Sequence, residues 1–160
     1  MKPIVFRAAG PADMKFVVDA WANSYKASYS AGLIQIDDYF EIMIPQIEKA
    51  IARPDVKVTL ACIPDELPGA DIAGFIVADT EEAPALIYYV FVKVHYRRAA
   101  RLGLERGIAS QLFREIGVDL AKPFNYVCQT FTALMLHQTK MPLAKWKPLL
   151  GRFPKHERRK

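Results

Sequence analysis

A basic, glycine-containing stretch holds the residues of this sequence that are best suited to bind an anion. The stretch contains one acidic residue, Glu105, and five cationic residues, which are Lys93, Arg97, Arg98, Arg101 and Arg106. An amphipathic helix is predicted to begin at Gly107, and the unpaired N–H groups and the dipole of a helix start favour bound anions. Gly107 would let the backbone approach a phosphate closely, and Ala109 keeps the first turn small. The alternative is that Gly107 only opens a helix and the arginines coat a solvated loop.

Side chains that could move a proton precede the basic stretch or lie at its start. Tyr88 and Tyr89 are neighbours in a predicted strand, so we expect them to point to opposite faces of a sheet. Tyr89 shares its predicted face with Phe91, Lys93 and His95, and the ordinary pKa of histidine suits proton transfer. Glu81 and Glu82 at the preceding turn could act as a general base through water, although charged turn residues are more often simply solvated. The candidate catalytic residues are therefore Tyr89, Glu82 and His95, with core packing or phosphate contact as their alternative roles.

Length and composition predict one domain without a membrane span. The chain has 160 residues, of which 52% are apolar, and we expect one domain at 1–153 with a basic tail at 154–160. No apolar run is long enough to cross a bilayer and the N-terminus is unlike a signal peptide, so action in the cytoplasm is expected. The net charge of +5 suggests an anionic partner. A solvated tail and a nucleic-acid-binding arm remain alternative interpretations of the basic end.

Neither a disulfide nor a metal site is expected. Cys62 and Cys128 each lie in an apolar run, where a buried thiol behaves as a small hydrophobe. His95, His137 and His156 lie far apart and match no spacing of metal ligands.

Hydrophobic periodicity predicts the order β, α, α, β, β, β, α, β, α. Strands are predicted at 4–7, 56–63, 72–78, 86–96 and 124–131. A first helix follows Gly10 and Pro11, and a second is capped by Asp37 and kinked or divided by Pro45. The third helix begins at Gly107, and residues 132–153 are predicted to be partly helical. Three successive strands in the middle predict an antiparallel meander, which excludes a doubly wound fold.

Four segments together resemble the GNAT superfamily of acyl-CoA-dependent N-acyltransferases. They are VFRAAGPADMKFVVDAW, IAGFIVAD, YYVFVKVHYRR and RGIASQLF, in the order and spacing of the family, and they cover about three quarters of the chain. The resemblance implies an α+β fold of three layers. Its central sheet is mixed, mostly antiparallel and twisted, with splayed central strands, flanking helices and a shortened C-terminal end.

The resemblance also implies acetyl-CoA as co-substrate, an amine of a protein or small molecule as acceptor, and a monomer or homodimer. Val92 and Val94 would lie beside the pantetheine arm, and the Val92 N–H would polarise the donor carbonyl. The glycine turn would hold the pyrophosphate. The full set of residues expected at the coenzyme is Val92, Lys93, Val94, Arg97, Arg98, Arg101, Arg106, Gly107, Ile108, Ala109 and Ser110.

Two departures from the family pattern leave other functions open. The loop before Gly107 is enlarged by AARLGLE, with Leu104 where the family has arginine or glutamine. Lys147 falls near the place of the tyrosine that protonates the leaving thiolate in that family. A narrower resemblance, through AWANSYKASY and DDYF, is to small members encoded by bacteriophages and prophages. The alternatives are therefore a catalytically weak phage effector that binds a host protein in the host cytoplasm, or a nucleic-acid-modifying protein.

Overall fold

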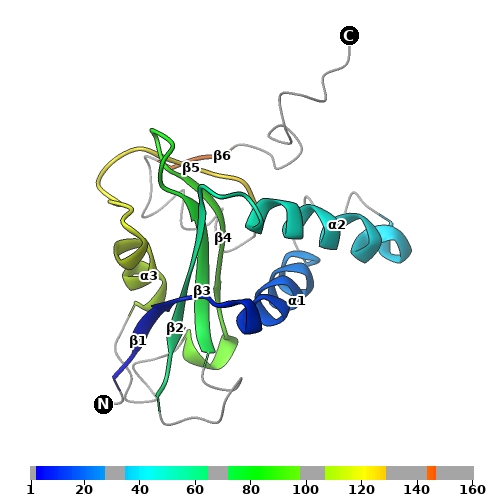
Figure 1. The fold of residues 1–160 in the computed structure, drawn as a ribbon, viewed down its shortest axis with the longest axis horizontal. Helices are drawn as coiled ribbons and strands as arrows, with labels where there is room; N and C mark the ends of the chain where they lie inside the picture. The colour runs from blue at the N-terminus through cyan, green and yellow to red at the C-terminus, as the bar shows by residue number, and fades with distance from the viewer. Residues whose placement is uncertain (1–2, 28–34, 65–71, 98–106, 129–143, 147–160) are drawn as a thin grey trace.

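One open sheet organises the protein. The computed structural model describes residues 3–27, 35–64, 72–97, 107–128 and 144–146. The described strands lie side by side in the order in which they occur along the chain (Figure 1). Their bounds are β1 (Val5–Ala8), β2 (Val56–Cys62), β3 (Ile72–Asp79), β4 (Leu86–Val92), β5 (Phe124–Tyr126) and β6 (Ala144–Trp146).

The sheet is mixed and mostly antiparallel, as predicted. β1 through β4 pair antiparallel with one another, and β5 then pairs parallel with both β4 and β6. The predicted meander of β2, β3 and β4 is confirmed. Every residue of β3 is buried, because this strand is covered on both faces.

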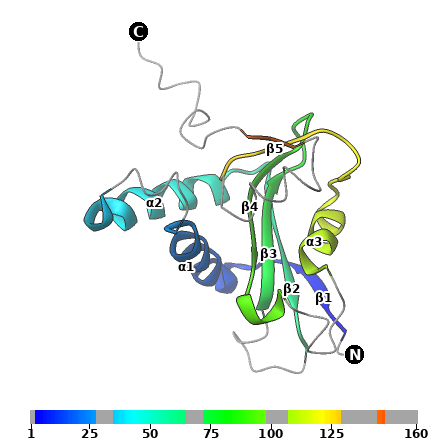
Figure 2. The same ribbon diagram turned by 180° about the vertical axis from the view of Figure 1, so that it is seen from behind.

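Helices cover both faces of the sheet and give three layers. α1 (Met14–Tyr25) and α2 (Ile36–Ile51) lie on one face, and α3 (Ile108–Ile116) lies on the other (Figures 1 and 2). The core is accordingly divided into two apolar clusters. The first, between the sheet and α1 and α2, includes Trp21 and Phe75, and the second, beneath α3, includes Ile76 and Leu112. The fold class predicted from the sequence, an α+β sheet flanked by helices, is confirmed.

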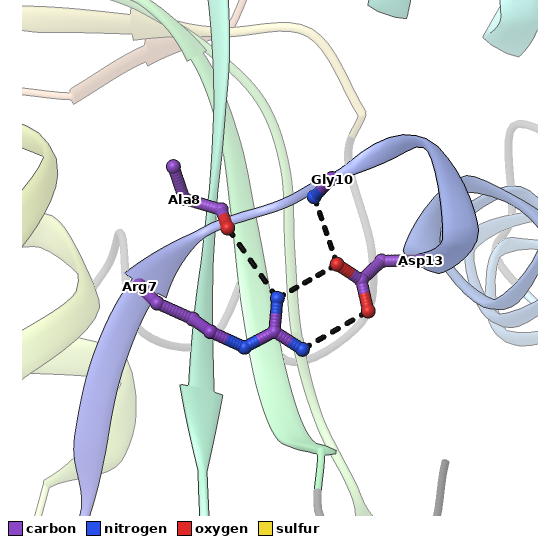
Figure 3. A network of polar contacts seen from close by, with 4 residues as sticks. All are labelled: Arg7, Ala8, Gly10 and Asp13. Atoms are coloured by element: carbon purple, nitrogen blue, oxygen red, sulfur yellow. Dashed lines mark hydrogen bonds and ion pairs between the residues drawn. The ribbon is translucent and has the colours of Figure 1, made fainter. Parts of the chain in front are cut away.

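A polar contact fixes the entry into α1. Gly10 precedes a short 3-10 helix, η1 (Pro11–Asp13), as expected from proline at a helix start. The Asp13 carboxylate accepts hydrogen bonds of 2.7 and 3.0 Å from Arg7 on β1 and one of 2.8 Å from the Gly10 N–H (Figure 3). The same guanidinium also lies 3.4 Å from the Ala8 carbonyl. This Arg7–Asp13 clasp joins the edge of the sheet to the helical layer.

The second helix has a different cap from the one predicted, and of the two outcomes predicted for Pro45, a kink or a division, the division is absent. Its N-cap is Gln35, and Asp37 lies in the first turn, so the prediction of Asp37 as cap was wrong. There its negative charge complements the helix dipole. Pro45 lies inside α2 and does not divide it. Because Pro45 is exposed, water can hydrogen-bond the carbonyl that the missing N–H leaves unpaired.

β4 is shorter than the predicted strand 86–96. It ends at Val92, and a 3-10 helix, η3 (Val94–Tyr96), follows. The turn closes because the Tyr96 and Arg97 N–H groups bond back to the Lys93 carbonyl at 2.9 and 3.2 Å. The prediction was wrong here because an apolar run does not by itself distinguish a strand from the turn that ends it.

A β-bulge in β4 overturns the prediction that Tyr88 and Tyr89 face opposite ways. Tyr89 pairs with Val77 and Ile87 pairs with Ala78, so Tyr88 is the extra residue on β4. Both tyrosines are buried in the cluster beneath α1 and α2. A bulge inserts one residue and so interrupts the alternation of side chains.

The C-terminal predictions fall mostly outside the described residues. β5 covers the start of the predicted strand 124–131, and of residues 132–153, which were predicted to be partly helical, only the strand at 144–146 is described. The tail at 154–160 lies outside the described ranges. Cys62 and Cys128 are both buried free thiols. Among the described helices, none combines the length and apolar character needed to span a bilayer.

Candidate functional site

β4 and β5 separate shortly after they meet. They pair only at Leu86 with Asn125 and at Ile87 with Tyr126. The last hydrogen bond between them runs from the Val127 N–H to the Ile87 carbonyl, at 2.9 Å. Figure 1 shows β5 beside only one end of β4. The splay predicted for the central strands is therefore present, and the rest of β4 has no described partner strand on this side.

The backbone of β4 turns polar groups toward the splay. The Lys93 N–H bonds the Ala73 carbonyl on β3 at 2.8 Å. In an antiparallel ladder the direction of the main-chain groups alternates, so those of Val90 and Val92 point away from β3. The Val92 carbonyl accepts a hydrogen bond of 2.8 Å from Arg97 Nε. The N–H and carbonyl of Val90 and the N–H of Val92 remain as an edge that could pair with an extended, amide-containing ligand.

The start of α3 provides a second set of N–H groups. Gly107 has φ 75° and ψ 44°, in the left-handed region that glycine adopts without strain. The first helical hydrogen bond runs from the Gln111 N–H to the Gly107 carbonyl at 2.9 Å. The N–H groups of residues 108–110 therefore have no acceptor within the helix. Side chains connect this turn to the strand end, because Val92 and Tyr96 pack against the apolar cluster that contains Ile108.

The described cations lie on different sides of this site. Arg97 is exposed, and its Nε donates a hydrogen bond to the Val92 carbonyl, which holds the guanidinium near the end of β4. Lys93 Nζ lies 5.3 Å from the ring centroid of Phe16, on α1, so its side chain lies on the face opposite α3. Arg98, Arg101 and Arg106 lie outside the described residues.

Val94 and His95 follow the strand end. Val94 is 74% exposed, in η3 rather than on β4, so its predicted place along the strand was wrong. His95 is exposed, and its ring lies 3.9 Å, centroid to centroid, from that of Tyr96. The roles expected from the sequence, Val94 at the coenzyme and His95 in proton transfer or phosphate contact, stay predictions.

Tyr89 lies in a group of aromatic rings beside the splay. Its ring stacks on Trp21 with 5.2 Å between centroids, and Tyr25 meets its edge at 6.2 Å. The hydroxyl lies 2.7 Å from Ser24 Oγ on α1. Burial raises the pKa of the Tyr89 hydroxyl well above its ordinary value, so the hydroxyl stays protonated at neutral pH.

The direction of the Tyr89 hydrogen bond follows from its neighbours. Ser24 Oγ lies 2.6 Å from the Ala20 carbonyl, which can only accept. Since Ser24 has one hydroxyl hydrogen and donates it to Ala20, Tyr89 must donate to Ser24. The Tyr89 oxygen keeps lone pairs that can accept a further hydrogen bond. Sequence reasoning missed Ser24, because a serine within a helix that matches no motif gives no signal.

The three predicted catalytic residues are not brought together. Glu82 lies in the turn before β4, where its N–H bonds Asp79 Oδ1 at 3.2 Å, whereas His95 follows the other end of the strand. At about 3.3 Å per residue, β4 separates them by roughly 20 Å. Tyr89 lies between them. A single proton-transfer centre cannot therefore include all three side chains.

The state of the Cys128 thiol and the arrangement of the described metal-ligating residue types bear on the chemistry that is available between β4 and β5. Cys128 lies just beyond β5 in the same cluster as Tyr89, and burial raises the pKa of its thiol to about 12. It is thus a neutral thiol at physiological pH, not a nucleophilic thiolate. Within the described ranges, no group of three or more His, Cys, Asp or Glu side chains could hold a metal ion.

Comparisons with known proteins give structural likeness alone. No family model matches the chain, and no curated protein sequence matches it. A possible acetyltransferase from Clostridium difficile 630 is 13% identical with a TM-score of 0.48, over 98% of this chain and 83% of that chain. The aminoglycoside antibiotic 6'-N-acetyltransferase AAC(6')-Ih from Acinetobacter baumannii is 14% identical with a TM-score of 0.48, over 98% and 95%. The PaiA N-acetyltransferase from Thermoplasma acidophilum, solved with coenzyme A, is 17% identical with a TM-score of 0.37, over 72% and 74%. Likeness at this level does not assign a function to this chain.

Proposed function

We propose that the protein is an acyl-CoA-dependent N-acyltransferase of the GNAT type, with acetyl-CoA as donor and an amine as acceptor. The observation that carries the proposal is the open edge of β4 beyond Ile87, where the main-chain groups of Val90 and Val92 point away from β3. Pantetheine contains two amide groups, and an exposed strand edge is suited to pair with such a chain. The N–H groups of residues 108–110 suit a pyrophosphate.

The residues present fit the donor in charge and in hydrogen-bonding type. Val90 offers both a donor and an acceptor, and Val92 offers an N–H for the thioester carbonyl. The left-handed backbone of Gly107 opens the start of α3, and a side chain there would be strained. Arg97 adds a charge-assisted contact to phosphate. Arg98, Arg101 and Arg106 are proposed to add to it from outside the described residues.

The reaction forms a bond from the acceptor nitrogen to the acyl carbon and breaks the carbon–sulfur bond. The amine loses one proton, and the departing CoA thiolate takes one. Tyr89 is the proposed source of the thiolate's proton, because its protonated hydroxyl lies beside the splay. Transfer requires its hydrogen to leave Ser24, so Ser24 is proposed to hold the hydroxyl in place between turnovers.

Isothermal titration with acetyl-CoA and free CoA tests the proposal. We expect binding by the wild-type chain and a loss of affinity of at least about tenfold for Gly107→Glu, because a carboxylate would face the phosphates. Gly117→Glu is the matched control. Gly117 is also left-handed, at the other end of α3, with φ 94°. A wild-type chain that binds neither ligand, or equal losses in both variants, would refute the assignment.

Turnover and cellular role need a separate measurement. Mass spectrometry should detect acyl addition to small amines or lysate proteins with the wild-type chain and none with Gly107→Glu. Acetyl-CoA binding without any product would instead favour a catalytically weak effector, the role suggested by the resemblance to phage-encoded members.

A further inference from the structure

Asp79, the last residue of β3, carries a carboxyl group that is buried. Its exposed fraction is 0%. Oδ1 accepts hydrogen bonds of 3.0 and 3.2 Å from the N–H groups of Glu81 and Glu82. Oδ2 is buried and receives no N–H donor from the described residues. An ionised carboxylate oxygen in that position would be costly, whereas a protonated one can donate a hydrogen bond.

Asp55 supplies the acceptor. Val56 pairs with Asp79 across β2 and β3, so Asp55, the residue before Val56, adjoins this pair at the start of β2. A hydrogen bond between the two carboxyl groups would account for the directions in which each shifts the other's pKa, upward for Asp79 and downward for Asp55. Such a bond requires a proton, because two carboxylates have only acceptors. Arg53 forks onto the Asp55 oxygens at 3.4 and 3.2 Å, so Asp55 is the carboxyl that keeps the negative charge.

We propose that Asp55 and Asp79 share one proton in the folded protein and form a pH-dependent latch between the start of β2 and the β3–β4 turn. The latch has four parts: the Arg53 fork, the shared proton, and the two N–H bonds that hold the turn. Asp79 also pairs with Leu86, where β4 begins. The latch therefore lies beside the pairing of β4 with β5, from which the splay opens.

Among the residues that the structure describes, the other charged side chains near the latch are Lys57, Glu81 and Glu82. Lys57 Nζ on β2 lies 3.9 Å from Glu81 Oε1, and both side chains are mostly exposed. Glu82 is half-buried in the turn. The N–H groups of Glu81 and Glu82 bond Asp79 and lower its pKa, which opposes part of the rise caused by burial and by Asp55.

The latch is complete only within a window of pH. Burial and the contact with Asp55 raise the pKa of Asp79 above its ordinary 3.8, so its contribution to stability is lost as pH rises through the raised value. The hydrogen bond from Asp79 and the Arg53 contact lower the pKa of Asp55 below 3.8, so its contribution is lost as pH falls through the lowered value. Between the two values one proton remains.

Asp79→Asn tests the latch, because the amide keeps the acceptor at Oδ1 and replaces the shared proton with a permanent N–H donor. In the wild type, hydrogen-exchange protection of the Val56 amide, which bonds the Arg53 carbonyl at 3.1 Å at the start of β2, should fall by about tenfold, beyond the intrinsic pH effect, once Asp79 ionises and no longer donates to Asp55. In Asp79→Asn this loss should be absent. Asp119→Asn is the control, since Asp119 accepts the Ala121 N–H at 2.9 Å but is exposed. It should retain the wild-type pH response of the Val56 amide.

A titration of the wild-type side chain keeps the test decisive if the variant does not fold. The carboxyl carbon of Asp79, followed by NMR, should titrate above the ordinary range and that of Asp55 below it. Titration of Asp79 at or below 3.8 would overturn the proposal, as would the same loss of protection in Asp79→Asn and the wild type.

Discussion

At the residue scale, Tyr89 is the side chain whose surroundings bear most on catalysis. Its hydroxyl hydrogen-bonds Ser24, its ring stacks on Trp21, and its backbone pairs with β3. Since burial keeps the phenol protonated, it can serve as a proton donor at neutral pH but not as a base.

Tyr89→Phe should lower kcat by about tenfold or more while leaving the Kd for acetyl-CoA unchanged, because only the proton donor is removed. Steady-state kinetics with titration of the coenzyme measures both quantities. Tyr39→Phe is the control, since it removes a hydroxyl that donates to the Ala22 carbonyl at 2.7 Å in the same cluster. An equal fall in kcat for both variants would argue for a packing role alone.

Sequence reasoning reached Gly107 but not the orientation of Tyr89. A glycine at the start of a strongly amphipathic helix is a local signal, and both the helix and the left-handed glycine are present. The orientation of Tyr89 depends on the bulge at Tyr88, which arises from the pairing of β4 with a distant strand. Nothing in the local sequence specifies that extra residue.

At the element scale, the contact between β3 and β4 sets the shape of the open edge. A Cβ built on Gly74 would lie 2.4 Å from the Phe91 carbonyl oxygen and 3.2 Å from Val92 Cα. Glycine at this position lets the two backbones approach closely, just where β4 presents Val92 to the splay.

Gly74→Ala should destabilise the fold by about 1–3 kcal/mol, because the methyl group must push β4 away from β3. It should also weaken acetyl-CoA binding. Denaturant unfolding and calorimetric titration measure the two effects. Gly10→Ala is the control, because a Cβ there would lie 3.7 Å from Asp13 Oδ2, at an ordinary contact distance. A fully stable Gly74→Ala with unchanged affinity would contradict the close approach.

Helices and strands were predicted well where the hydrophobic periodicity of the sequence is strong, and poorly where the chain turns. Val17, Trp21 and Tyr25 recur at helical spacing after Gly10 and Pro11, where the first helix was predicted, and all three are buried in α1. The end of β4 was predicted too late because Val94 and Tyr96 have strand-forming side chains, whereas Arg97 and the Lys93 carbonyl close a turn there. Such a turn depends on contacts that a local pattern does not contain.

At the scale of the whole molecule, the Arg7–Asp13 clasp joins the sheet to the helical layer. The hydrogen bonds from Arg7 lower the pKa of Asp13, so the clasp contributes stability above the ordinary Asp pKa of 3.8. That contribution is lost as pH falls through the lowered pKa. Solvent screens the half-exposed guanidinium, which limits the contribution to about 1 kcal/mol.

Asp13→Asn should therefore lower Tm at neutral pH and flatten the decline of Tm in acid, because the amide carries no charge to titrate. Thermal unfolding followed from neutral pH to below about pH 4 measures this. Asp19→Asn removes only an exposed pair with Lys15 and should leave the acid limb as in the wild type. Parallel curves for Asp13→Asn and the wild type would exclude the clasp as a source of acid sensitivity.

The strand order has a consequence for how the protein is made. Because each described strand lies beside its neighbour in sequence, the sheet can grow outward from β1 in step with synthesis at the ribosome. β4 would then complete the meander before β5 exists, and its second edge would be unpaired during that interval. An exposed strand edge favours pairing with other chains. Co-translational aggregation should therefore be greatest for nascent chains that end between β4 and β5.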